Sequence, residues 1–278
     1  MLSKIGRHVA FGAGGVHNMD MAASSGHVAG AQVVGRVAAV LRTVSASMPG
    51  GLGTSAVADA TGLSRPTAHR ILNSLAADGF VDHDPDASRW YLGPELYLMG
   101  AIAAERYDIT GVARDSVRAL AAATGESAFL SARRGDETVC LLREEGAFPI
   151  RSFVLYEGVR FPLGVASAGL AILSFLPDAH IDEYLAGTDL TSAYGASHAP
   201  GAVRERVLAT RAAGYAVNPG LLVEGSWGMA AAVFDRGGQP AWALSLTGVE
   251  SRFGADRRPE LGRLLLDHAH RISQRLAR

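Results

Sequence analysis

Two residue types are nearly absent from this sequence of 278 residues, which has one cysteine, Cys140, and one lysine, Lys4. A single cysteine excludes an internal disulfide and is typical of the reducing cytoplasm. Cys140 lies in the apolar run T-V-C-L-L, so we expect a buried core thiol rather than a reactive one. No uncharged apolar run approaches the ~18 residues of a membrane-spanning helix. We therefore expect a cytoplasmic protein with no membrane partner.

An excess of positive charge is also missing, since 26 lysine and arginine residues stand against 27 aspartate and glutamate residues, for a net charge of −1. Bulk charge therefore does not predict nucleic-acid binding. The distribution is more informative: several acidic residues gather within residues 78–86, whereas residues 64–74 contain none. DNA binding would then depend on local potential, backbone amides and the avidity of a dimer.

Residues 54–77 predict a helix, a tight turn and a second helix. The signals are of the kinds that begin, fill and end helices. They are an N-cap at Thr54, inward residues Val57 and Ala60, a left-handed end at Gly62 and a second N-cap at Ser64.

The second of these helices has two chemically different faces. Its apolar residues recur at i, i+3, i+4 and i+7, which predicts one buried stripe of Ala68, Ile71, Leu72 and Leu75. The other face carries hydrogen-bond donors, apart from one proline, and no acid, as a helix in a DNA groove requires. The candidate DNA contacts are Thr54, Ser64, Arg65, Pro66, Thr67, His69, Arg70 and Asn73. The alternative is an ordinary surface helix of a globular domain.

A short β-ribbon is predicted directly after this helix. Residues 80–81 and 90–92 are apolar or aromatic, and residues 84–88 (D-P-D-A-S) supply a turn. A helix-turn-helix followed by such a ribbon is a winged helix. The tip of the wing would place Ser88 or Arg89 near a DNA backbone, so Arg89 completes the set of candidate DNA contacts.

Composition and periodicity divide the chain into four segments. Residues 1–31 are rich in small residues and lack periodicity, which predicts a disordered tail. Residues 32–92 would form the DNA-binding domain, residues 93–110 a linker helix, and residues 111–278 an α+β domain. In that last domain, strands are expected at residues 127–132, 138–143, 150–156, 215–217, 221–224, 228–234 and 241–247, with a polar loop at residues 187–197.

The sequence resembles the IclR family of bacterial transcriptional regulators. The matching stretches are G-R-V-A-A-V-L at residues 35–41, A-D-A-T-G-L-S-R-P-T-A-H-R-I-L-N-S-L-A-A-D-G-F-V at 58–81 and W-Y-L-G-P-E-L at 90–96. The resemblance implies a winged helix-turn-helix joined by a linker helix to a GAF-like α+β effector-binding domain. It also implies a repressor, or alternatively an activator, that binds double-stranded operator DNA and responds to a small organic or aromatic acid. Such proteins form homodimers, which often pair again into tetramers.

The resemblance further implies an effector site in the second domain. The positions that match the family's site are Ser167, Ala168, Asn218, Gly228, Ser245 and Thr247. The alternation along A-L-S-L-T-G puts the last two hydroxyls on one face of a strand. The alternative is that these two hydroxyls face solvent as ordinary strand residues.

Two departures from the family pattern affect this site. Many members carry a histidine and a lysine where this sequence has Gly164 and Leu170. A ligand carboxylate would therefore depend on backbone amides at the start of the helix, on hydroxyls or on an arginine such as Arg160. Several aromatic residues are available to line the site, although core packing also explains them; they are Phe129, Phe153, Tyr156 and Trp227.

A hydrolase is the competing class of function. The stretch V-A-S-A-G around Ser167 resembles the nucleophile elbow G-x-S-x-G, but Val165 replaces its first glycine. A catalytic triad would also need a late histidine, and the candidates His268 and His270 fall on the predicted closing helix. The sequence has no H-E-x-x-H motif and no cysteine pair. We therefore expect a regulator rather than an enzyme, with no metal and no cofactor.

Overall fold

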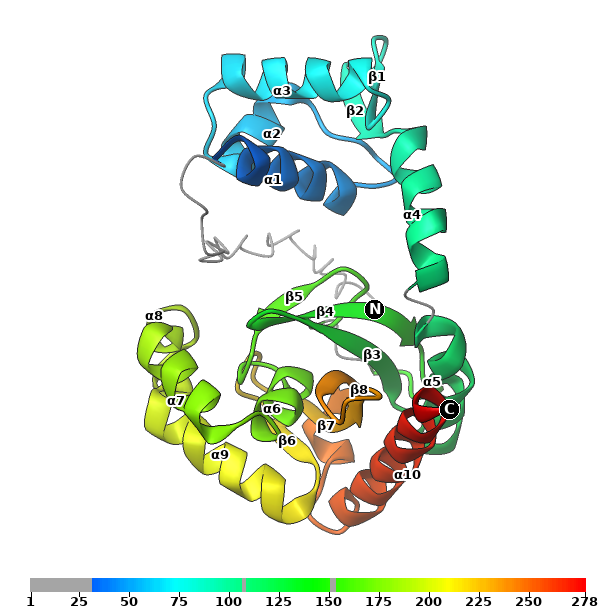
Figure 1. Cartoon of the computed structure of the whole chain (residues 1–278), viewed down its shortest axis with the longest axis vertical. Coiled ribbons are helices and arrows are strands. Elements are labelled where there is room, and N and C mark those ends of the chain that lie inside the picture. The colour runs from blue at the N-terminus through cyan, green and yellow to red at the C-terminus, as the bar shows by residue number, and fades with distance from the viewer. Residues whose placement is uncertain (1–31, 107–108, 151–153) are drawn as a thin grey trace, which may run out of the picture. The chain divides into compact units, whose positions relative to one another are not determined.

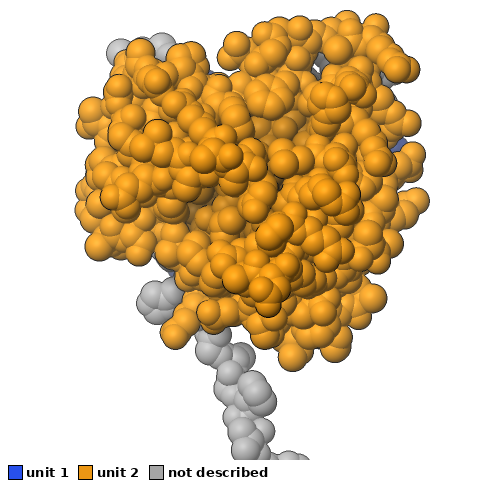
Figure 2. Space-filling view, turned by 90° about the horizontal axis from the view of Figure 1, so that it is seen from below, with its two compact units in different colours: residues 1–104 blue, residues 105–278 orange. Residues whose placement is uncertain are grey.

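The computed structural model describes residues 32–106, 109–150 and 154–278. The predicted tail at residues 1–31 lies outside the described residues. The chain divides into two compact units, Met1–Ala104 and Glu105–Arg278, which are coloured separately in Figure 2. The division falls inside the predicted linker helix.

The N-terminal unit is a three-helix domain followed by a β-ribbon and a further helix (Figure 1). The elements are α1 (Gln32–Ala46), α2 (Thr54–Thr61), α3 (Arg65–Ala77), β1 (Val81–Asp84), β2 (Arg89–Leu92) and α4 (Pro94–Arg106). Strands β1 and β2 pair antiparallel, with Val81 opposite Leu92 and Asp84 opposite Arg89. This arrangement is the predicted winged helix-turn-helix.

Trp90 organises the core of the N-terminal unit. Its side chain is only 2% exposed, and it packs among residues of all three helices, including Val44, Val57 and Leu72. Its indole N–H donates a hydrogen bond to Thr54 Oγ1 at 2.9 Å. The expectation that Thr54 caps α2 is therefore wrong, because Gly53 holds the N-cap position without a side-chain bond. The inward position predicted at Ala60 is also wrong, since Ala58 is buried in its place.

The C-terminal unit is an α+β domain built on a six-stranded sheet. The strands are β3 (Ser127–Arg134), β4 (Glu137–Glu144), β5 (Arg160–Pro162), β6 (Ala216–Pro219), β7 (Ser226–Phe234) and β8 (Pro240–Val249). Their order is β5-β4-β3-β8-β7-β6, and every neighbouring pair is antiparallel. The helical elements are α5 (Ile109–Thr124), α6 (Ser167–Ser174), α7 (Asp178–Gly187), α8 (Leu190–Tyr194), α9 (Pro200–Ala213), α10 (Arg258–Ala277) and two 3-10 turns, η1 (Ala196–His198) and η2 (Glu250–Arg252).

Helices cover both faces of this sheet, as Figure 1 shows. On one face, α5 and α10 pack on alternate residues of the central strands, such as Leu130, Leu244 and Leu246. On the other face, α6 packs against β7 and β8, with α9 and α7 beyond it. Helix α6 is buried along its whole length, which explains why its sequence is apolar on every side.

Two predictions of local structure in this unit are wrong, and a third, the strand at residues 150–156, falls partly outside the described residues. Residues 151–153 lie outside the described residues, and the flanking Ile150 and Leu155 are not in a strand; the edge strand is β5 instead. The apolar run at residues 221–224 forms a turn, because the Asn218 side chain accepts the Leu221 N–H at 3.0 Å and bends the chain after β6. The predicted polar loop at residues 187–197 contains α8 and the start of η1.

Candidate functional site

The turn between α2 and α3 fixes the direction of the second helix. Gly62 has φ +66°, and this left-handed conformation ends α2. Ser64 is extended, with φ −64° and ψ 144°, and its hydroxyl accepts the Thr67 N–H at 3.4 Å. Pro66 lies in the first turn of α3, where a missing N–H costs nothing. The predicted N-cap at Ser64 and helix end at Gly62 are both present.

Helix α3 separates a buried face from an exposed donor face. Ala68, Leu72 and Leu75 are buried. The exposed residues include Arg65, Pro66, His69, Arg70, Asn73 and Ser74, and Thr67 is half-buried. The Asn73 amide lies 3.1 Å from His69 Nδ1, one turn apart on this face. Among the described residues, neither Arg65 nor Arg70 forms an ion pair within the chain, so both guanidinium groups remain available to a partner.

The wing is tied to the body of the N-terminal unit. Asp84 Oδ1 accepts the backbone N–H groups of Asp86 and Ala87, which forms the turn, and Ser88 follows with φ +53°. Arg89 Nη1 donates to the Gly50 and Gly51 carbonyls at 3.2 and 2.9 Å. The Arg89 guanidinium therefore holds the wing against the loop before α2, in addition to any contact it makes with a partner.

The six residues predicted for the effector site lie together where α6 begins. In the register of the sheet, Asn218 on β6 pairs with Gly228 on β7, and Gly228 pairs with Thr247 on β8. Ser245 lies two residues before Thr247 on the same face of β8. A side chain at Gly228 would lie 3.0 Å from Ser167 Oγ, so the glycine lets the start of α6 approach the sheet. Ser167 and Ala168 form that start, and both are buried.

The polar atoms of this cluster differ in whether they have partners. Asn218 Nδ2 donates to the Val165 carbonyl at 2.8 Å and so holds the loop before α6. Ser245 is fully buried and Thr247 is 5% exposed, yet Ser245 Oγ and Thr247 Oγ1 have no hydrogen-bond partner among the described residues. An unpartnered buried hydroxyl costs roughly 1–3 kcal/mol. Apolar surroundings with a few such polar groups are typical of small-molecule sites.

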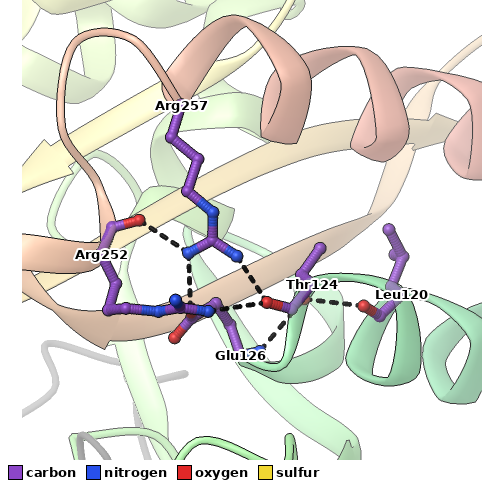
Figure 3. A network of polar contacts seen from close by, with 5 residues as sticks. All are labelled: Leu120, Thr124, Glu126, Arg252 and Arg257. Carbon is purple, nitrogen blue, oxygen red and sulfur yellow. Dashed lines mark hydrogen bonds and ion pairs between the residues drawn. The ribbon is translucent and has the colours of Figure 1, made fainter.

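A buried carboxylate joins the end of α5 to the segment before α10 (Figure 3). Glu126 is 1% exposed, and its Oε1 accepts from Arg252 Nε and Arg257 Nη1, both at 2.7 Å. Both arginines also donate to the Thr124 carbonyl at the end of α5. This network joins α5, β3, η2 and the start of α10. Sequence reasoning missed it, because Glu126 lies more than 120 residues from both arginines along the chain.

Comparison with known proteins decides the family. The model of the bacterial transcriptional regulator IclR C-terminal domain matches residues 101–274, and that of the IclR helix-turn-helix domain matches residues 33–85. The chain belongs to the IclR family of transcriptional regulators. The resemblance found in the sequence is thus confirmed, together with a helix-turn-helix domain followed by an α+β domain.

Relatives of this IclR-family chain span nearly all of it. The glycerol operon regulatory protein of Streptomyces griseus is 33% identical over 259 residues, which cover 88% of this chain and 96% of the relative. An IclR transcriptional regulator from Alicyclobacillus acidocaldarius has a TM-score of 0.74 at 24% identity and covers 87% of this chain and 98% of its own. An IclR homolog from Microbacterium hydrocarbonoxydans, in complex with 4-hydroxybenzoate, has a TM-score of 0.72 at 21% identity, with coverages of 87% and 98%.

The IclR-family assignment also decides against a hydrolase, because the relatives are regulators and not enzymes. The geometry agrees. Ser167 begins α6 on one face of the sheet, whereas His268 lies on α10, which covers the other face. Within the described part of the chain, no group of three or more histidine, cysteine or acidic residues could hold a metal ion. No helix there is long and apolar enough to span a membrane.

One residue near the effector cluster was missed by sequence reasoning. His198 is fully buried in η1, with Nδ1 2.9 Å from the Tyr194 carbonyl and Nε2 3.5 Å from the Val165 carbonyl. Burial lowers the pKa of His198, and the bond to Tyr194 opposes this shift. The ring therefore lies against the same Val165 carbonyl that Asn218 holds. The surrounding segment reads as a polar loop, so its sequence carries no signal for a buried histidine.

The residues offered as extra ligand contacts differ in their placement. Arg160 on β5 forms an ion pair with Glu137 on β4, so its charge already has a partner. Phe129 is fully buried, Trp227 is half-buried beneath the Arg258 guanidinium, and Tyr156 is exposed. Phe153 lies outside the described residues. Gly164 has φ +81°, and a side chain there would lie 3.0 Å from Val203, so the family's histidine would not fit this loop conformation.

Proposed function

We propose that this protein is a sequence-specific regulator whose α3 helix reads the major groove of an operator. The observation that carries the proposal is the exposed, acid-free donor face of α3, with Arg70 and Asn73 at its centre. Arginine suits guanine or phosphate, and asparagine suits adenine or phosphate. The contacts we propose are Thr54, Ser64, Arg65, Pro66, Thr67, His69, Arg70, Asn73 and Arg89.

We further propose that the protein binds its operator as a homodimer, which pairs again into a tetramer. One winged helix contacts a single half-site, so reading a palindrome needs two copies. Helix α4 supports this proposal, because its apolar side chains face solvent in the single chain. The exposed residues are Tyr97, Leu98, Met99 and Ile102.

The effector we propose is a small organic or aromatic acid, held by Ser167, Ala168, Asn218, Gly228, Ser245 and Thr247. The two unpartnered hydroxyls support a polar ligand group at this place. The complex of the Microbacterium hydrocarbonoxydans homolog with 4-hydroxybenzoate makes hydroxylated aromatic acids the first class to test. Effector binding would favour one spacing of the paired α3 helices and so change the population that fits the operator.

We propose that the protein is a repressor and that, in the cytoplasm, it releases the operator when the acid binds. Activation is the alternative within the same family. A gel-shift titration with the DNA upstream of the gene and of its neighbours tests the proposal directly. Specific, saturable binding that an acid reverses supports it. Release that is unchanged when Asn218, Ser245 and Thr247 are replaced together would reject the effector site and leave DNA binding intact.

A further inference from the structure

Three buried polar atoms without a partner lie on one face of the C-terminal sheet. Among the described residues, six buried side-chain nitrogen and oxygen atoms lack a hydrogen-bond partner. Two of them are the effector-site hydroxyls of Ser245 and Thr247, and a third is Arg143 Nε on β4. The effector role rests on the proposed function, but nothing in the sequence pointed to Arg143.

The sheet register places Arg143 in line with Ser245. Ser245 on β8 pairs with Phe129 on β3, and Phe129 pairs with Arg143 on β4. Their neighbours Leu130, Leu142 and Leu244 belong to the core under α5 and α10. Since side chains alternate along a strand, the row of Ser245, Phe129 and Arg143 faces the other way, toward α6. Two strand spacings separate the ends of the row, or about 10 Å between Cα atoms.

The Arg143 guanidinium lies over this face rather than in open solvent. Only 22% of its side chain is exposed. Its charge acts on the buried Cys140 thiol, which packs against Phe129. Burial raises the pKa of that thiol to about 12; the charge of Glu157 adds to the rise, and the bond to the Leu142 carbonyl and the charge of Arg143 oppose it.

The acidic neighbours of Arg143 leave one donor unused. Glu145 is half-exposed and accepts from Nη2 at 2.7 Å, and Glu157, which is exposed, accepts from the backbone N–H of Arg143 at 3.3 Å. Neither carboxylate bonds to Nε. Since Glu145 is half-exposed, solvent screens its attraction for Arg143, and a second carboxylate can compete for the same guanidinium. Arg160, the other cation considered, is already paired with Glu137.

We propose that Arg143 binds the acid group of the effector, with the ligand lying across Phe129 and its opposite polar end on Ser245 and Thr247. The ligand class is then an acid with an apolar or aromatic middle and a hydroxyl remote from the carboxylate. A short acid confined to the start of α6 would not reach both ends of the row.

The experiment compares acids with their uncharged amides. Hydroxybenzoates and the matching hydroxybenzamides are titrated by calorimetry into wild-type protein, Arg143→Gln and the control Arg160→Gln, with melting temperatures recorded without ligand. We expect wild type and Arg160→Gln to prefer the acid at least tenfold, about 1.4 kcal/mol. Arg143→Gln should lose that preference while its weak amide binding stays unchanged. Arg143→Lys, which keeps the charge, should retain an intermediate preference for the acid. If the glutamine variant does not fold, the lysine variant is used in its place.

The outcomes separate this inference from the proposed effector site. If Arg143→Gln keeps the acid preference while Ser245→Ala/Thr247→Val abolishes binding, the site stands and the role of Arg143 is overturned. If Arg143→Gln loses acid binding and amide binding equally, the arginine has a structural role, and its proposed role in binding the acid group is again overturned. Wild-type protein that binds none of the acids rejects the ligand class and, with it, the role of Arg143.

Discussion

Arg70 offers the most direct test at the scale of single residues. Its side chain is exposed on α3 and forms no hydrogen bond or ion pair with the described residues, so Arg70→Ala should leave the melting temperature unchanged. Loss of a guanine contact should weaken operator binding by about 1–3 kcal/mol. A gel-shift titration at fixed salt measures this change. The control is Arg263→Ala on α10, which removes another exposed arginine, one that pairs, within the described part of the chain, only with Asp267 on its own helix. Equal affinity of both variants would contradict a role for Arg70 in recognition.

The buried His198 predicts a pH dependence of stability. Its pKa is lowered in the folded protein, so the unfolded chain binds the proton first as the pH falls below the ordinary value of 6.5. Stability is therefore complete above pH 6.5 and declines toward acid. Burial lowers the pKa of His268 as well, which adds to the same trend.

His198→Gln should flatten this profile between pH 7.5 and 5.5, because the new side chain does not titrate. Melting temperatures across this range measure the slope of stability against pH. A constant difference in melting temperature between variant and wild type at neutral pH does not affect this slope. His270→Gln, at an exposed position on α10, is the control. A slope in His198→Gln as steep as that of wild type would show that the imidazole does not set the acid limit.

At the scale of elements, Glu126 should be the most sensitive single position outside the apolar core. Glu126→Ala leaves two arginines, 31% and 26% exposed, without their shared carboxylate. Breaking a fully buried pair costs about 3–5 kcal/mol. Since both arginines reach solvent, we expect a loss near the lower end, about 3 kcal/mol, in urea unfolding of the C-terminal unit.

A double-mutant cycle with Arg257→Ala separates the ion pair from lost packing. Loss of the ion pair accounts for the destabilisation if the double variant loses clearly less free energy of unfolding than the two single variants lose in sum. Additive losses would assign the effect of Glu126→Ala to packing beside Gly248, which the glutamate side chain closely approaches.

The elements that could be predicted from the sequence are those set by local patterns. The buried stripe of α3, the N-cap at Ser64 and the wing each depend on residues that lie close together in the sequence. The strand predicted at residues 221–224 is wrong because an apolar run alone does not show that the nearby Asn218 side chain bonds to the Leu221 backbone and turns the chain. The roles of Arg143 and Glu126 could not be predicted because strand register and the segment before α10 bring together residues that are distant in the sequence.

At the scale of the whole molecule, function depends on the number of copies. Four large apolar residues of α4 face solvent, and one of them, Ile102, is 72% exposed. Isolated exposed apolar residues are ordinary, but four on one short helix suggest a covered surface. Ile102→Asp should therefore shift the protein toward monomer in sedimentation velocity, because a buried charge without a partner opposes pairing.

Operator affinity should fall with the loss of the dimer, even though α3 is untouched. Two linked winged helices gain about 10²–10⁴ in affinity over one, so Ile102→Asp should weaken binding to a palindrome at least a hundredfold. Binding to a single half-site should stay as weak as that of wild type. The matched control is Leu208→Asp on α9, an apolar residue that is 59% exposed in the other unit. An Ile102→Asp protein that sediments as wild type does and binds the palindrome equally well would place the contact between copies on a surface other than α4.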